Sequence, residues 1–311
     1  MLKGRPGNGA PFRFAGPLLS SARAAGHDAG MRMTTCLLAA SLALLSFPLK
    51  AADPASSRWA AASRPTTGPT QVIGGHGLGC IAGAVALPAD GPGWQVVRVS
   101  RNRFWGHPTM LATLRDLAAA ATQAGLPQIW IGDLGQPRGG PMPWGHSSHQ
   151  IGLDADVWLD VSRRPLLSIA ARERIEVPSL VRADGMAVDR AIYTEQHATL
   201  IRLAAQQPGV DRIFVNPAIK QALCTAHAGE PWLRRIRPWR GHDSHMHIRL
   251  RCPAGQAACQ DQAPVPAGDG CDASLAWWFS DEARRPPAPS TRPPAPAPRL
   301  PAACTGVLAA P

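Results

Sequence analysis

Residues 240–252 read RGHDSHMHIRLRC and hold three histidines within six positions, at His242, His245 and His247. From residue 245 onward apolar and polar residues alternate, which is the period of a half-buried β-strand. Because residues two apart on a strand project from the same face, we expect His245 and His247 to project together while the apolar residues between them enter the core. Alone, such a pair also fits a polar sheet edge where the rings only form hydrogen bonds.

A second polar cluster lies upstream, in residues 145–158, GHSSHQIGLDADVW. It contributes His146, His149, Asp154 and Asp156. Five of the ten histidines in the chain therefore lie in two short stretches. The spacing from His149 to Asp156 does not fit one helical face, but it fits a loop histidine followed by a strand, with Gly152 permitting the turn. On that strand Asp154 and Asp156 share a face.

These residue types together indicate a metal site. A hydrolytic zinc takes three protein ligands from histidine and carboxylate and leaves a fourth position for water. The ion lowers the pKa of that water to about 7, and a nearby histidine can carry the proton. Two clusters about 90 residues apart could build such a site if their strands are neighbours. In the alternative interpretation, His146 and Ser147 order the loop and Asp154 caps a helix or pairs with an arginine.

Other catalytic arrangements lack their motifs. The sequence has no Gly-x-Ser-x-Gly elbow of a serine hydrolase, no His-Glu-x-x-His helix and no Cys-x-x-Cys pair. The formal charge of +11 comes almost entirely from scattered arginines, since only three lysines occur. No stripe of basic residues interleaved with aromatics is present, so we predict that the protein does not bind nucleic acid.

The N-terminus has the pattern of a secretory signal. A basic start near Met31 or Met33 precedes an apolar run over residues 36–47, which is too short to span a bilayer. We therefore expect an N-terminal extension and signal peptide over residues 1–52, export, and no membrane insertion. Removing Cys36 with the signal leaves six cysteines, an even number that fits three disulfides with 15 possible pairings.

The rest of the chain predicts an α+β domain. We expect a loose linker over residues 53–70, a domain over residues 71–285 and a Pro-rich tail over residues 286–311. Strands are expected at 95–99, 128–132, 152–159, 212–215 and 245–251. Helices are expected at 110–124, capped by Thr109, from Asp189 to about 207, and from 217 to about 226.

The residues also resemble a known family. The segment SSHQIGLDAD (147–156) is similar to the Ser-x-His-x-x-Gly-x-Ala-x-Asp signature of D-alanyl-D-alanine peptidases, with Asp154 in place of the Ala. These enzymes group with lysostaphin-type peptidases and the hedgehog domain, which have a small, mainly antiparallel sheet with flanking helices. The closer resemblance is to the penicillin-insensitive murein endopeptidases, carried by residues 145–158, 212–224, 237–239, 245–254, 268–271 and 278–279.

The resemblance implies roles for individual residues. It makes His149, Asp156 and His247 ligands of one zinc ion. His245 would be the general base or proton shuttle. His242 would orient the substrate or stabilise the oxyanion. His146 would lie near the metal, and Asp184 would belong to a second metal site. Ala187 stands where the histidine of that second site would be, which argues against tight binding there. The implied disulfides are Cys80–Cys304, Cys224–Cys271 and Cys252–Cys259, the first of which would tie the tail to the domain.

The resemblance also implies a substrate, the cross-linked stem peptides of peptidoglycan in the periplasm. The bond would be the D-alanyl–meso-diaminopimelyl amide, cut by a metal-activated water that offers β-lactams no serine to acylate. Two alternatives stay open: a carboxypeptidase or dipeptidase acting on D-Ala-D-Ala, and a non-catalytic wall-binding module with a structural zinc.

Overall fold

The computed structural model describes residues 54–285 and 299–311. The predicted signal and residues 286–298 of the Pro-rich tail lie outside these residues. The helices of the described residues are α1 (Pro54–Ala60), α2 (Pro108–Gln123), α3 (Ile169–Glu173), α4 (Glu195–Gln206), α5 (Pro217–His227), α6 (Ala273–Trp277), α7 (Asp281–Arg284) and α8 (Ala303–Ala309). None of them is long and apolar enough to cross a membrane.

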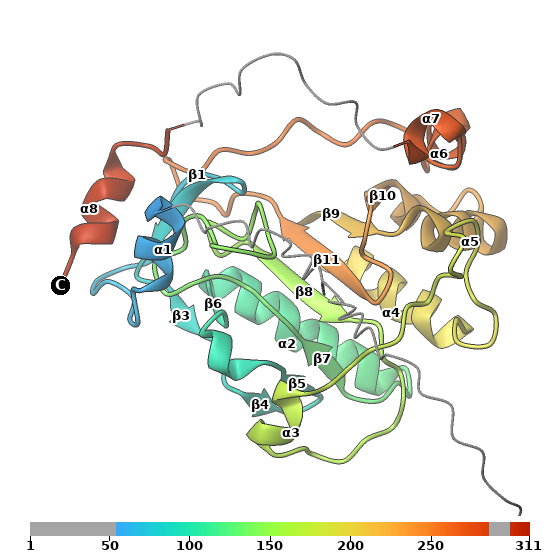
Figure 1. The fold of residues 1–311 in the computed structure, drawn as a ribbon, viewed down its shortest axis with the longest axis horizontal. Helices are drawn as coiled ribbons and strands as arrows, with labels where there is room; N and C mark the ends of the chain where they lie inside the picture. Colours follow the sequence, from blue (N-terminus) through green and yellow to red (C-terminus); the bar gives the residue numbers. More distant parts are fainter. Residues whose placement is uncertain (1–53, 286–298) are drawn as a thin grey trace, which may run out of the picture. The chain divides into compact units, whose positions relative to one another are not determined.

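A seven-stranded sheet organises these residues, with strand order β10-β9-β11-β8-β7-β5-β4 (Figure 1). Its strands are β4 (Asp90–Gly91), β5 (Trp94–Val96), β7 (Ile129–Ile131), β8 (Asp154–Trp158), β9 (Val210–Val215), β10 (Ile236–Pro238) and β11 (His245–Leu250). The pairs β10–β9 and β5–β7 are parallel and the others antiparallel. Two small ribbons accompany it: β1 (Gln71–Gly75) with β2 (Leu78–Ala82), and β3 (Val85–Ala86) with β6 (Trp105–Gly106). The predicted α+β class with a mainly antiparallel sheet is confirmed.

The two central strands, β8 and β11, each have one apolar and one polar face. Val157 of β8 and Ile248 of β11 belong to the main core cluster, together with Leu114 of α2 and Ile201 of α4. Because successive side chains alternate between faces, the histidines and aspartates of the same strands project from the opposite side of the sheet. The packing of α2 and α4 therefore fixes the register that brings the two polar clusters together.

Two helix starts differ from expectation. The cap of α2 is His107, whose Nδ1 accepts a hydrogen bond from the Thr109 amide at 3.1 Å. Pro108 then occupies the first helical position, where its fixed φ favours the helix. Helix α4 begins only at Glu195, because the Asp189 carboxylate accepts from the Ala191 amide and holds a turn there instead.

Three disulfides join Cys80 to Cys304, Cys224 to Cys271 and Cys252 to Cys259, the pairs that the resemblance implies. The first attaches α8 to β2 across 224 residues of sequence. Helix α1 packs at the same place, because its Trp59, 2% exposed, forms a small core cluster with this disulfide. The segment expected to be a loose linker thus contains a helix with a buried side chain.

Candidate metal centre

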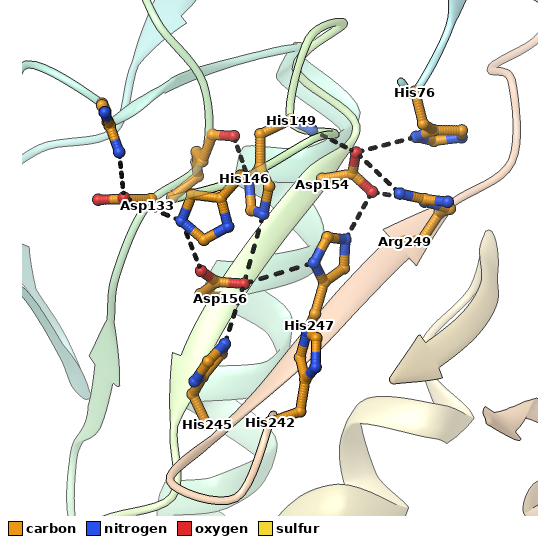
Figure 2. Close-up of polar contacts among 12 residues, drawn as sticks. His76, Asp133, His146, His149, Asp154, Asp156, His242, His245, His247 and Arg249 are labelled. Carbon is orange, nitrogen blue, oxygen red and sulfur yellow. Dashed lines mark hydrogen bonds and ion pairs between the residues drawn. The ribbon is translucent and has the colours of Figure 1, made fainter. Parts of the chain in front are cut away.

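The two polar clusters meet at the pairing of β8 with β11. The Cα atoms of His247 and Asp156 are direct partners across this antiparallel pair, and those of Arg249 and Asp154 are the next pair on the same face. Figure 2 shows these side chains pointing toward the loop that carries His146 and His149. The predicted neighbourhood of the two clusters is therefore present in the fold.

The loop before β8 adopts strained backbone to deliver His149. This residue has φ 65°, a conformation that residues other than glycine rarely adopt and that concentrates at functional sites. Gly152 has φ 69°, and a Cβ there would lie 2.9 Å from the His107 amide nitrogen, so the turn requires glycine. The His149 amide donates to Asp154 at 3.0 Å, and its Nδ1–H donates to the Leu134 carbonyl at 2.7 Å. These bonds direct Nε2 of His149 into the centre.

Asp154 organises the other side of the centre. Its carboxylate accepts from His247 Nε2 at 2.9 Å, from Arg249 Nε at 2.7 Å and from His76 Nδ1 at 3.2 Å (Figure 2). Burial acts to raise the pKa of Asp154, but His76, Arg249 and His247 outweigh it and hold this pKa well below its ordinary value. The pairing of Asp154 with an arginine is therefore real, yet it also fixes the ring of His247 and leaves Nδ1 directed at Asp156.

Two imidazole nitrogens face one carboxylate oxygen of Asp156. His149 Nε2 lies 3.4 Å and His247 Nδ1 3.5 Å from Asp156 Oδ1. Both His149 Nε2 and Asp156 Oδ1 are buried without a hydrogen-bond partner. An unpaired buried polar atom is costly, and ligand atoms about 2.0–2.2 Å from one tetrahedral ion would be separated by roughly this spacing. The donor set and its geometry fit a divalent metal ion.

The protonation states agree with that fit. Burial lowers the pKa of His247 to about 4 against the opposing charge of Asp154, so the ring is neutral at pH 7 and can donate a lone pair. Burial also acts to lower the pKa of His149, but the charge of Asp156 dominates and raises it to about 9. A metal cation bound between His149 and Asp156 would take the place of the proton that His149 otherwise carries.

His146 also reaches the centre. Its Nε2 lies 3.5 Å from Asp156 Oδ2 and within a cluster of mutually close ligand atoms with His149 and Asp156. The same nitrogen is 3.1 Å from Asp133 Oδ2 and donates its hydrogen there, so it is already engaged. Two side chains, His146 and His247, can therefore complete a ligand set with His149 and Asp156; His146 belongs to the group of mutually close ligand atoms, and His247 has the nitrogen without another hydrogen bond.

Asp133 and His76 are contacts that the sequence interpretation missed. Asp133 is buried and accepts from Arg103 at 2.9 Å and from Arg101 at 3.2 Å as well as from His146. Neither residue lies in a histidine-rich stretch, and only the order of strands brings them to the centre. Asp133 does lie two residues after β7, which is the one sequence signal that could have suggested it.

The two remaining histidines lie at the open side. His245 Nε2 is 3.8 Å from Asp156 Oδ1, and its Nδ1 is buried without a partner. The ring of His242 lies 4.9 Å from that of His245 and 5.9 Å from that of His247. His242 has φ 52° and donates from Nδ1 to the Arg240 carbonyl at 3.0 Å. Burial, and then the charge of His245, lowers the pKa of His242, so this ring is neutral near pH 7.

Asp184 lies apart from this group. Its exposed carboxylate accepts from Arg182 at 2.8 Å and from the Met186 amide at 2.9 Å. No contact among the described residues joins it to the histidines, and Ala187 offers no ligand.

A cleft of about 520 Å³ opens over the centre. Its lining residues are Gly77, Gly145, His146, Ser147, Ser148, Arg212, Phe214, Trp239, Arg240, His242, His247, Arg249 and Gln262. Three of them are arginines, but Arg249 is paired with Asp154 and Arg212 with Asp211, so of these three only Arg240 has no ion pair within the described residues and favours an anionic ligand.

Comparison with known proteins identifies the family of this chain. The family described as penicillin-insensitive murein endopeptidase matches residues 72–309. The chain is 48% identical over 239 residues to the penicillin-insensitive murein endopeptidase of Haemophilus influenzae, covering 75% of this chain and 81% of that protein. It is 43% identical over 251 residues to the proteins of the same name from Klebsiella pneumoniae and Salmonella typhi, covering 80% of this chain and 89% of each. The chain belongs to the penicillin-insensitive murein endopeptidase family.

Proposed function

We propose that the protein is a zinc-dependent murein DD-endopeptidase that hydrolyses the D-alanyl–meso-diaminopimelyl amide between peptidoglycan stem peptides in the periplasm. The observation that carries the proposal is the pair of buried, unpartnered atoms, His149 Nε2 and Asp156 Oδ1, beside His247, a residue that lines the cleft. The names and high identity of the relatives support the substrate.

His149, Asp156 and His247 would hold the zinc ion. When bound there, zinc supplies Lewis acidity, which lowers the pKa of a water and polarises the carbonyl to be cleaved. Zinc is preferred because two imidazoles and one carboxylate are the ligand set of hydrolytic zinc sites. Leu134 and Asp154 fix the orientation of the two rings through hydrogen bonds to the nitrogens that do not face the centre.

His245 would move the proton. It shares a strand face with His247, and its ring lies at the same carboxylate as the proposed ligands. As the attacking water forms its bond to the carbonyl carbon, His245 accepts the water's proton and then delivers it to the leaving amine of diaminopimelate. His242, neutral and adjacent, has donated its one N–H to the Arg240 carbonyl, so its Nε2 would orient the substrate by accepting a hydrogen bond from it.

No serine acts as nucleophile in this scheme, so a β-lactam finds no hydroxyl to acylate. The relatives are named endopeptidases, which favours a substrate that continues on both sides of the bond over a free D-Ala-D-Ala terminus. An endopeptidase is therefore favoured over the carboxypeptidase, and the histidines beside the ligands favour catalysis over a purely structural zinc.

The test is digestion of purified muropeptide dimers, read by mass spectrometry. We expect dimers to become monomers, no release of a single alanine from a pentapeptide, loss of cleavage with chelator and recovery with zinc. Cleavage by metal-free protein, or alanine release alone, would overturn the proposal. His227→Ala is a matched control, because that ring lies on α5 and contacts Glu195 and Trp232 instead of the centre.

A further inference from the structure

A row of four aromatic rings leads away from the metal centre. We define the aromatic row as Phe214, Trp239, Trp278 and Trp277. The Phe214 ring lies 5.4 Å from that of His247, and the following steps along the row are 5.6, 6.2 and 5.5 Å. Such separations are those of direct aromatic contacts. The row is therefore a continuous surface that begins at a proposed metal ligand.

Two of the four rings of the row are exposed, and the other two are half-buried. Trp239 is 53% and Trp277 46% exposed, and Trp278 is half-buried. None of these three indole N–H groups donates a hydrogen bond within residues 54–285 and 299–311, whereas Trp94 and Trp105 donate to Pro88 and Asn102. Contiguous exposed aromatic surface marks an interaction site, and free indole donors add polar contacts to it.

The row is held in place by covalent and capping contacts. Helix α6 follows directly after Cys271, which is bonded to Cys224 of α5. Asp272 caps α6 by accepting from the Ser274 amide at 2.9 Å. Trp239 follows β10, so the row joins the end of the sheet to α6 (Figure 1). The exposed indoles therefore sit on anchored elements.

The occupant can be inferred from the chemistry of the proposed substrate, on which this inference rests. Its stem peptides are attached to N-acetylhexosamine rings, which have C–H faces that stack on indoles and hydroxyl or amide edges that accept from an indole N–H. An extended peptide advances about 3.3–3.6 Å per residue, so a four-residue stem reaches about 14 Å from the cleaved bond. Summed from the ring of His247, the steps of the row reach at most 11.0 Å at Trp239 and 17.2 Å at Trp278, and the length of the stem lies between these two values. We propose that Trp239, Trp278 and Trp277 form a subsite for the sugar rings of the glycan strand.

The experiment compares two substrates that differ only in sugar. One is the disaccharide-bearing muropeptide dimer, and the other is the same cross-linked peptide with the disaccharides removed. For Trp277→Ala and Trp278→Ala we expect kcat/KM on the sugar-bearing dimer to fall about 5- to 10-fold, mainly because KM rises. A decrease of this size is expected when one aromatic contact is lost. Cleavage of the sugar-free dimer should be unchanged. Trp277→Phe, which keeps a ring face, should lose less, and Leu166→Ala, which removes a 65% exposed side chain elsewhere, should lose nothing.

Direct binding gives a second measurement that does not depend on catalysis. Titration with tri-N-acetylchitotriose should change the tryptophan fluorescence of the wild type, and the Trp277→Ala, Trp278→Ala double variant should lose that change while keeping its thermal unfolding midpoint. Equal loss on both substrates, no loss on either, or self-association abolished by Trp277→Ala would overturn the sugar subsite. If the wild type cut neither dimer, the proposed function would fail, and the titration would still decide the subsite by itself.

Discussion

Asp154 and His247 are joined across β8 and β11 by a hydrogen bond of 2.9 Å from Nε2 to Oδ1. This contact decides which nitrogen of His247 faces Asp156, and hence whether the ring can be a ligand. Asp154 is not itself in the proposed ligand set, but it holds a ligand, and Arg249 and His76 keep it charged. The orientation of the centre therefore depends on a group that lies two residues from Asp156 along β8.

Asp154→Asn should weaken zinc binding by about 10- to 100-fold, the usual effect of removing a carboxylate that orients a ligating histidine. The amide keeps the shape of the side chain but no longer favours a proton on Nε2 of His247. Zinc affinity measured by competition with a chelating dye checks this. Asp160→Asn is the matched control, since that carboxylate pairs with Arg164 and Ser162 away from the centre. Wild-type affinity in Asp154→Asn would contradict the role of the contact.

His245→Ala should retain bound zinc and lose most turnover, because the residue carries a proton and is not a ligand. General acid–base catalysis contributes about 10²- to 10⁴-fold, so we expect a fall in kcat within that range. His149→Ala should instead lose both metal and activity. Metal content by atomic emission and cleavage of muropeptide dimers separate the two effects, and loss of zinc from His245→Ala would make His245 a ligand.

His146→Ala should keep at least one tightly bound zinc ion, because Nε2 of His146, although it reaches the centre, already donates its hydrogen to Asp133. Asp133→Asn should weaken the hydrogen bond that His146 donates to residue 133. Arg101 and Arg103 then lose the carboxylate with which both form ion pairs. We expect the Asp133 variant to lower activity through the position of the 145–149 loop while zinc content stays at one. Complete loss of zinc in His146→Ala would show that this histidine belongs to the ligand set in place of His247.

The strands that carry chemistry could be predicted from the sequence because their two faces differ. The alternation in 245–251 and 152–159 corresponds to β11 and β8, and Gly152 has the positive φ expected of its turn. Helix starts were less predictable, since Asp189 and Thr109 are as good caps by type as Thr194 and His107. The choice between them is made by the packing of α2 and α4 on the sheet.

The contacts around the ligands could not be predicted from spacing. His76, Asp133 and Leu134 reach the centre only because β7 pairs with β8 and because the loop after β1 lies beside the turn at His149. Such contacts depend on strand order, which no local pattern records. The aromatic row is a similar case, because Trp239 and Trp278 lie 39 residues apart and meet only through α6.

The last prediction concerns Lys220, a fully buried lysine on α5 whose Nζ donates to the carbonyls of Leu233 and Asp269. Burial lowers its pKa from the ordinary 10.5 to about 8, against the opposing charge of Asp269. Between pH 8 and 10.5 the unfolded chain therefore binds more protons than the folded one. The contribution of Lys220 to the free energy of unfolding consequently rises with pH, by up to about 1.4 kcal/mol per pH unit. Lys220→Met lacks this contribution. In urea unfolding with the disulfides intact, the stability difference between wild type and Lys220→Met should grow from pH 7.5 to 9.5, whereas a constant difference would mean that the buried amine has an ordinary pKa.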